Sequence, residues 1–132
     1  MIVHRDKPEV FGVLDWELST IGHPLADFTY HLMIWHMPEI GIGSIGLAGK
    51  DLEKLGIPDA EAYTRKYCER TGRDAIDNLD FYFAFNLFRL AAILQGIAGR
   101  VRDGTAASAH AAQAVKAVQP LADLGWHFAS RQ

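Results

Sequence analysis

The sequence predicts a single, mainly helical domain that opens with a short β-hairpin. The apolar runs Ile2-Val3 and Val10 to Leu14 flank the charged, turn-forming segment HRDKPE, a pattern typical of a hairpin within residues 1–15. Between residues 24 and 130, apolar side chains recur at helical spacing and no further strand pattern follows. Because 132 residues bury one core but not two of ordinary size, we expect one unit over residues 1–132.

The first predicted helix spans residues 24–37. Pro24 suits its first turn, since proline has no N–H to leave unsatisfied there, and Pro38 follows its end. The glycine-rich segment 38–50 supports neither a helix nor a long strand, so we expect a mobile connection and a candidate substrate-side loop.

Two further helical segments come next. Residues 51–55 predict a short turn of helix, and residues 58–71 a longer helix that stops at Gly72. Tyr63 and Tyr67 are four residues apart, which stacks them on one face of the longer helix.

A long apolar helix is predicted over residues 78–103, with Asp77 as its N-cap and Gly104 just past its end. Ala92 and Gly96 lie four apart in it, which would let another backbone approach closely on that face. Thr105 is expected to cap an alanine-rich helix over residues 105–118, and a last helix is expected from Pro120 to about Ser130. We assign all three tryptophans to the core: Trp16, Trp35 and Trp126.

Composition narrows the class of protein. The formal charge of −3 comes from 13 basic and 16 acidic side chains that are scattered along the chain, so no basic stripe indicates nucleic acid. The single cysteine, Cys68, cannot form an intramolecular disulfide, and the N-terminus lacks a signal-peptide pattern, which favours a cytoplasmic location. The most apolar segment is interrupted by Asn86 and Arg89, so we expect no membrane span.

The candidate metal ligands are Asp15 and Glu17, directly after the second strand. A carboxylate at the end of a strand is held rigidly and points beyond the sheet, and Mg²⁺ prefers one or two carboxylates together with phosphate oxygens. From the residues alone, Asp15 could equally cap the following turn, with Glu17 solvated. Asp27, early in the first helix, is favoured there by the helix dipole.

The segment LDWELSTIGHPLADFTYHL (residues 14–32) resembles the metal-binding region of the aminoglycoside phosphotransferase and choline kinase superfamily, which is related to protein kinases. The order matches: strand, Asp, aromatic, Glu, a short loop, Gly-x-Pro, then Asp early in a helix. The resemblance continues through YCERTGRD (67–74), NLDFYFAFNLFRLAAILQGIAGR (78–100) and AHAAQAVKAVQPLADLGW (109–126). These segments look most like the phosphotransferase domains associated with acyl-CoA dehydrogenases, and the resemblance covers the whole chain.

The resemblance implies a role for each carboxylate. Asp15 matches the aspartate of the kinase DFG motif, which binds the Mg²⁺ that bridges the nucleotide phosphates. Asp27 matches an aspartate that braces the catalytic loop, a structural role, and Glu17 is either a second ligand or a supporting residue. The implied fold is the C-terminal part of a protein-kinase-like lobe, and the implied cofactors are Mg²⁺ and ATP.

The tripeptide His4-Arg5-Asp6 also spells the HRD of protein kinases, but no asparagine follows at the required distance, so we assign it to the hairpin turn. The superfamily's own His-Gly-Asp loop and its nucleotide-binding parts would precede Ile2, and no glycine-rich phosphate loop occurs in the 132 residues. We therefore expect this chain, as the C-terminal portion of a phosphotransferase, not to catalyse transfer alone.

Other polar residues carry weaker signals. His31 and His36 are five apart on one helix, which does not place them on one face, and with His23 they do not predict a metal site. Arg89 lies inside an apolar helix, where a buried guanidinium needs a carboxylate or a ligand anion. The resemblance implies that Arg89 and Tyr82 line the acceptor groove.

Two functions stay open at this point: an ATP-dependent kinase acting on a hydroxyl of a small molecule, and a non-catalytic helical interaction module derived from such a kinase. The acceptor is open among aminoglycosides, choline-like alcohols, sugars and hydroxyacyl thioesters. Because a lone hairpin leaves a strand edge and an apolar face uncovered, we also expect self-association, as a homodimer through the hairpin or the helix faces.

Overall fold

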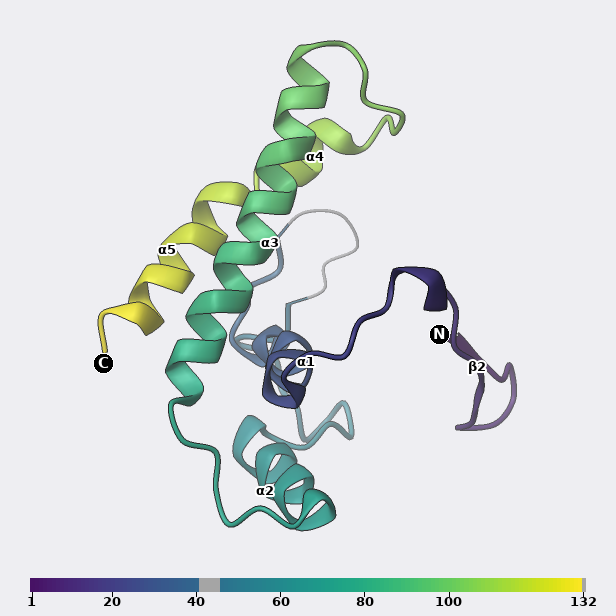
Figure 1. Ribbon diagram of the computed structural model, residues 1–132, viewed down its shortest axis with the longest axis vertical. Coiled ribbons are helices and arrows are strands. Elements are labelled where there is room, and N and C mark those ends of the chain that lie inside the picture. The colour runs from purple at the N-terminus through teal and green to yellow at the C-terminus, as the bar shows by residue number, and fades with distance from the viewer. Residues whose placement is uncertain (41–45, 132) are drawn as a thin grey trace.

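The computed structural model describes residues 1–40 and 46–131 and confirms the predicted fold class, a helical chain with an N-terminal hairpin (Figure 1). Its elements follow in chain order: β1 (Ile2–Val3), β2 (Val10–Gly12), the 3₁₀ turn η1 (Trp16–Leu18), α1 (Pro24–Leu32), the 3₁₀ turn η2 (Met33–Trp35), α2 (Ala60–Thr71), α3 (Leu79–Arg102), α4 (Ala111–Val115) and α5 (Val118–Ala129).

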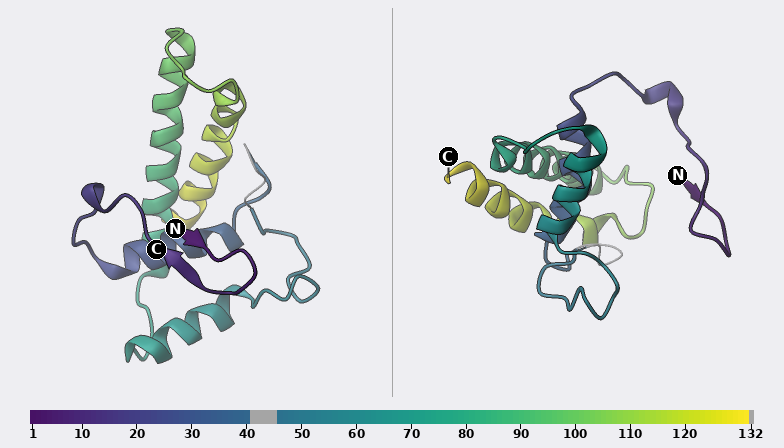
Figure 2. Two further views of the ribbon diagram at one scale, coloured as in Figure 1. Left: turned by 90° about the vertical axis from the view of Figure 1, so that its right-hand side faces the viewer. Right: turned by 90° about the horizontal axis from the view of Figure 1, so that it is seen from below.

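The hairpin stands apart from the helices. β1 and β2 pair antiparallel, with Ile2 opposite Gly12 and Val3 opposite Val10, and an irregularity between these two pairs. The predicted turn is confirmed, because the His4 N–H donates to the Glu9 carbonyl at 2.8 Å. Figures 1 and 2 show the hairpin joined to α1 by an extended segment and projecting away from the helical body. Its apolar side chains are consequently exposed.

The core lies where α3 crosses α1 and packs beside α5 (Figure 1). Phe83 and Leu87 of α3 are almost fully buried, as are Leu32 of α1 and Leu121 and Phe128 of α5. Phe83 and Leu87 are four residues apart and Leu121 and Phe128 are seven apart, which is the spacing of an apolar stripe on a helix that buries one face. α3 is also long and apolar enough to cross a membrane by length and composition. Its inward side, however, is packed against the other helices.

Aromatic side chains attach α2 to α1. The Phe28 ring stacks on Tyr67 with 3.9 Å between centroids and on Tyr63 at 5.9 Å, which confirms that the two tyrosines share a face. The Trp35 Nε1–H donates to the Pro58 carbonyl at 2.8 Å, and the half-buried ring packs against the core as predicted. Cys68, on the same helix, is buried as well.

Helix ends follow the predicted signals in part. Asp59 caps α2 through a 2.7 Å hydrogen bond from the Ala62 N–H, and Gly72 ends it at φ 67°, a conformation that glycine adopts freely. The N-cap of α3 is Asn78, at φ 55°, and not Asp77. The prediction was off by one residue because the backbone at the start of α3 is left-handed, a conformation that asparagine tolerates.

Two predicted helices, over residues 51–55 and 105–118, differ in the structure. Residues 51–55 form hydrogen-bonded turns rather than helix, since Asp51 accepts the Lys54 N–H through its side chain. Thr105 does not cap a helix: its hydroxyl turns back to the Arg100 carbonyl, and α4 begins only at Ala111. Part of the glycine-rich segment, residues 41–45, lies outside the described residues.

The close backbone approach occurs at Gly125 and not at Gly96. A Cβ on Gly125 would lie 3.3 Å from Leu87 Cβ, so this glycine lets α5 approach α3. A Cβ on Gly96 would meet no described atom within 4 Å, and Ala92 is exposed. The predicted small face of α3 therefore points away from the rest of the chain.

Candidate functional site

Asp15 occupies the turn between β2 and η1 in an unusual backbone conformation. Its φ of 63° and ψ of 37° are left-handed, a region that few residues other than glycine adopt. Its side chain is exposed, and within residues 1–40 and 46–131 no hydrogen bond or ion pair engages its carboxylate. A residue held in this conformation in the turn after a strand is a candidate for function, because left-handed backbone at residues other than glycine concentrates at functional sites.

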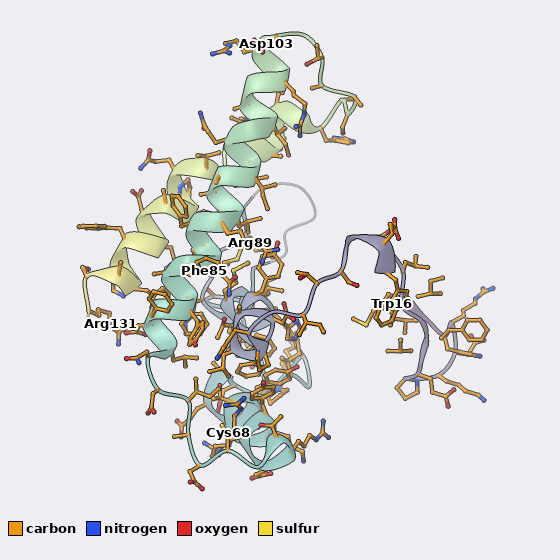
Figure 3. All side chains as sticks on the ribbon, viewed as in Figure 1. Trp16, Cys68, Phe85, Arg89, Asp103 and Arg131 are labelled. Atoms are coloured by element: carbon orange, nitrogen blue, oxygen red, sulfur yellow. The ribbon has the colours of Figure 1, made fainter. Side chains whose placement is uncertain are left out.

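Glu17 lies two residues further, within η1, and is exposed like Asp15. The turn is closed by Ser19, whose N–H and hydroxyl both donate to the Trp16 carbonyl, the hydroxyl at 2.6 Å. Both carboxylates are thus carried by a short closed turn. The predicted core position of Trp16 is wrong: its ring is exposed because the turn lies on the projecting arm (Figure 3).

Asp27 lies in the first turn of α1, where a carboxylate is favoured by the helix dipole. The side chain is exposed, and in the described part of the chain it has no hydrogen-bonding partner. Its predicted bracing role stays a prediction. The start of the helix itself is fixed by Pro24 and by contacts to α3.

A buried polar contact, which sequence reasoning missed, holds α1 against α3. The Asn86 amide donates to the Thr29 hydroxyl at 2.8 Å and to the Ala26 carbonyl at 2.9 Å. Thr29 in turn donates to the Leu25 carbonyl at 2.6 Å. Asn86 and Thr29 are both fully buried. The available signal was an asparagine inside a strongly apolar helix, since buried amides are almost always hydrogen-bonded.

Tyr82 contacts His23, the residue before α1, and Arg89 contacts Tyr30 within α1. The Tyr82 ring stacks on His23 at 5.5 Å, with 3.4 Å between its hydroxyl and His23 Nδ1. The Arg89 guanidinium lies over the Tyr30 ring, 5.1 Å from its centroid. The expectation of a buried Arg89 is wrong: the residue is exposed, because it lies at the edge of the contact between α3 and α1, where its guanidinium reaches solvent over the Tyr30 ring.

The structure therefore brings the predicted residues to two separate places. Asp15 and Glu17 flank Trp16, which lies on the projecting arm, whereas Arg89 lies on α3 (Figure 3). Tyr82 belongs to α3 as well. Among the described residues, no three His, Cys, Asp or Glu side chains gather to hold a metal ion. A metal bound at Asp15 would need further oxygen ligands from a nucleotide, water or another polypeptide.

Comparison with known proteins identifies the family. A model described as the phosphotransferase enzyme family matches residues 1–78, which include Asp15, Glu17 and Asp27. The chain belongs to this phosphotransferase family. Tyr82 and Arg89 lie outside the matched residues.

The curated relatives are considerably longer than this chain, which spans about an eighth to a sixth of their length. It is 46% identical to mouse acyl-CoA dehydrogenase family member 10, over all of this chain and 12% of that protein. Rat acyl-CoA dehydrogenase family member 11 is 36% identical over 99% of this chain and 17% of that protein. These matches confirm the resemblance to phosphotransferase domains associated with acyl-CoA dehydrogenases.

A solved structure supports the same fold. A crystal structure described as an aminoglycoside phosphotransferase from Ralstonia eutropha superposes with a TM-score of 0.88 at 49% identity. The match covers 98% of this chain and 39% of that chain. The helical arrangement and the hairpin are therefore those of a kinase-like phosphotransferase.

Proposed function

We propose that this chain forms the C-terminal portion of an ATP-dependent phosphotransferase that phosphorylates a hydroxyl group of a small molecule. The observation that carries the proposal is Asp15: an exposed carboxylate on a left-handed backbone, three residues after β2 at the start of η1, with no protein partner in the described residues and inside the region matched by the family. A carboxylate held in this way is available to a metal ion.

The residues at this turn fit Mg²⁺. This ion is usually bound by one or two carboxylates plus substrate phosphates and waters, rather than by a cage of protein ligands. Asp15 supplies one carboxylate, and Glu17 supplies a second oxygen ligand or a hydrogen bond to a bound water. When bound, Mg²⁺ neutralises charge on the phosphate oxygens during transfer. The residues of the turn contribute by fixing where those phosphates lie.

The helices supply the platform for the acceptor. The Arg89 guanidinium lies over the face of the Tyr30 ring. This contact leaves the N–H groups of Arg89 available to an anionic or hydroxyl-bearing acceptor. Tyr82 adds a hydroxyl close to the start of α1. The Asn86–Thr29 contact holds this surface in a fixed relation to α1.

Transfer requires parts that the 132 residues do not contain. The sequence has no His-Gly-Asp loop followed by asparagine and no glycine-rich phosphate loop. Because positioning and charge stabilisation provide most of the rate in phosphoryl transfer, we expect no activity from the chain alone. The phosphotransferase is favoured over the non-catalytic module considered above, since the family model and the solved structure are both described as phosphotransferases.

A chimera tests the proposal. The matching part of the Ralstonia eutropha protein is replaced by this chain, and ADP formation with ATP and Mg²⁺ is measured against aminoglycosides, choline-like alcohols, sugars and hydroxyacyl thioesters. We expect transfer to one of these classes, and a loss of about a hundredfold or more in Asp15→Asn. Asp103→Asn, at the far end of α3, is the matched control and keeps the activity. A folded chimera that transfers phosphate equally well with Asp15→Asn would contradict the proposal.

A further inference from the structure

A small pocket lies between α1 and α2, and we call it the α2 pocket. It has a volume of about 100 Å³, and its lining consists of aromatic and cationic side chains: Phe28, Tyr63, Lys66, Tyr67 and Arg70. The four lining residues of α2 follow the spacing i, i+3, i+4 and i+7, so they share one side of that helix. Pockets for drug-sized molecules usually measure about 300–1,000 Å³. The α2 pocket therefore suits one small group of a ligand.

Stacked aromatic rings form the floor of the α2 pocket. The Phe28 ring is buried, and both tyrosine rings of the pocket stack on it. These contacts hold Tyr63 and Tyr67 in place, and both residues are partly buried. Within residues 1–40 and 46–131, neither tyrosine hydroxyl forms a hydrogen bond. Two positioned hydroxyl groups are therefore available to a ligand.

Two cations line the α2 pocket, and no acidic side chain does. Lys66 and Arg70 are exposed, and neither forms an ion pair with any residue that the structure describes. Arg65, one residue before Lys66, differs because its guanidinium pairs with Glu61 at 2.7 Å. Glu69 lines a different cavity of α2. In a chain whose formal charge is −3, this pocket therefore concentrates positive charge.

The polar groups of the pocket require a ligand that accepts hydrogen bonds. Neither a lysine ammonium nor an arginine guanidinium can accept one, and a tyrosine hydroxyl donates readily. The complementary group is therefore an anion with several acceptor oxygens. A phosphate monoester has a charge of about −1.5 to −2 at pH 7 and three such oxygens, whereas a carboxylate has a single negative charge. Two cations in one pocket match the phosphate more closely than the carboxylate.

We propose that the α2 pocket binds the phosphate group of a phosphomonoester. The Arg70 guanidinium donates two parallel hydrogen bonds to phosphate oxygens, and the Lys66 ammonium adds a point charge. The hydroxyl groups of Tyr63 and Tyr67 donate to the remaining oxygens. This site goes beyond the proposed function, because no residue of the turn that carries Asp15 lines the pocket.

The rest of a phosphotransferase is the competing occupant, since this chain spans 39% of the Ralstonia eutropha chain that it matches. An acidic side chain of that remainder would pair with the same two cations. The lining of the pocket favours a small ligand in contact with solvent, because lysine is depleted where two protein surfaces pack together. The apolar floor is also already covered from within this chain, by the stacking of Phe28 on the two tyrosines.

Titration of the chain with inorganic phosphate, followed by NMR, tests the site. ATP and Mg²⁺ are left out, so the result does not depend on phosphoryl transfer. We expect saturable shifts of backbone amide signals centred on residues 63–70, with an affinity that Lys66→Gln and Arg70→Gln each weaken by about tenfold or more. Arg65→Gln removes a cation of the same helix outside the pocket and is the matched control, which keeps the affinity. Circular dichroism verifies that each variant is folded.

The hydroxyl groups are tested separately. Tyr67→Phe keeps the ring that stacks on Phe28 and removes only the hydroxyl, so we expect the affinity for phosphate to fall by about threefold or more with the fold unchanged. The absence of saturable shifts in the wild-type chain would overturn the proposal. An equal loss of affinity in Arg65→Gln and Arg70→Gln would also overturn it, because the effect would then come from overall charge.

Two further measurements address the competing occupant and the source of the phosphate. The titration is repeated in the Ralstonia eutropha chimera with ¹⁵N-labelled tyrosine, and we expect the signals of Tyr63 and Tyr67 to shift there as well. Their failure to shift in the chimera would overturn the proposal, because the remainder of the phosphotransferase would then occupy the pocket. Vesicles of phosphatidylcholine with and without phosphatidic acid distinguish the sources. Flotation that requires phosphatidic acid and is lost in Arg70→Gln assigns the phosphate to a lipid headgroup, whereas phosphate binding without flotation assigns it to a soluble phosphomonoester.

Discussion

The Asn86 amide on α3 donates a 2.8 Å hydrogen bond to the Thr29 hydroxyl on α1, and both side chains are fully buried. This contact joins the helix that follows the candidate metal turn to the helix that carries Tyr82 and Arg89. The Asn86 Oδ1 atom has no hydrogen-bonding partner among the described residues, so only the amide N–H groups contribute. The side chain is therefore needed as a donor.

Replacing that donor by an acceptor should loosen the two helices. Asn86→Asp keeps the shape of the side chain but sets a buried carboxylate against the Thr29 hydroxyl and the Ala26 carbonyl. We expect the free energy of unfolding to fall by about 3 kcal/mol or more at pH 7, as measured by urea denaturation. Asn78→Asp, the same change at the exposed start of α3, should alter it by less than about 0.5 kcal/mol. Equal effects at the two positions would contradict the contact.

Phe28 should hold α2 in place. Phe28→Ala removes the ring that stacks on Tyr63 and Tyr67, and the expected loss is about 3–5 kcal/mol of unfolding free energy. In Phe28→Ala, the amide hydrogen exchange rate should increase more in α2 than in α5, relative to the wild-type chain. The control Phe11→Ala removes an exposed ring from the hairpin and should leave the stability within about 0.5 kcal/mol. Uniform loss of protection in every helix would contradict a local role for Phe28.

His36 should make the fold sensitive to acid. Its ring lies 4.8 Å from that of Phe83 and 5.3 Å from that of Phe128, centroid to centroid. Burial lowers the pKa of His36 below its ordinary value of 6.5; Asp80 opposes this shift and Arg131 adds to it. The unfolded chain therefore binds the proton more tightly than the folded chain does. The free energy of unfolding should therefore be highest above about pH 6.5 and should fall as the pH drops below that value.

Urea denaturation between pH 5 and pH 8 measures this dependence. His36→Phe keeps an aromatic ring between Phe83 and Phe128 and should flatten the slope below pH 6.5. His110→Phe replaces an exposed histidine and should keep the wild-type profile. A His36→Phe profile that still declines as steeply as wild type would show that another group causes the acid sensitivity.

The sequence was informative about local structure. The apolar runs around a turn located the hairpin, and periodicity with Pro24, Gly72 and the apolar run of α3 located α1, α2 and α3, because these signals act over a few neighbouring residues. The predicted end of the first helix at residue 37 was too late, since α1 ends at Leu32 and continues as the 3₁₀ turn η2. The late start of α4 was missed, since Thr105 bonds backward to Arg100 rather than forward. Which of several competing hydrogen bonds a threonine makes depends on tertiary context.

Spatial relations were harder to predict. Trp16, Trp126 and Arg89 were all placed in buried surroundings from their residue types, and all three are exposed. Burial depends on which side of an element faces a neighbour, and α3 and α5 present one side to solvent. The position of Asp15 after a strand was predictable, whereas its left-handed backbone was not, because aspartate is compatible with both extended and left-handed backbone and its residue type does not choose between them.

The most direct test of the central claim is whether a divalent metal binds at the Asp15 carboxylate. Mn²⁺ with ATP is added to the Ralstonia eutropha chimera that carries this chain, and paramagnetic broadening of backbone amide signals is recorded by NMR. We predict broadening centred on residues 14–17, lost in Asp15→Asn and retained in Asp103→Asn. Asparagine is chosen because it tolerates the left-handed backbone of this position. Broadening centred elsewhere, or unchanged by Asp15→Asn, would contradict the assignment of Asp15 as the metal ligand.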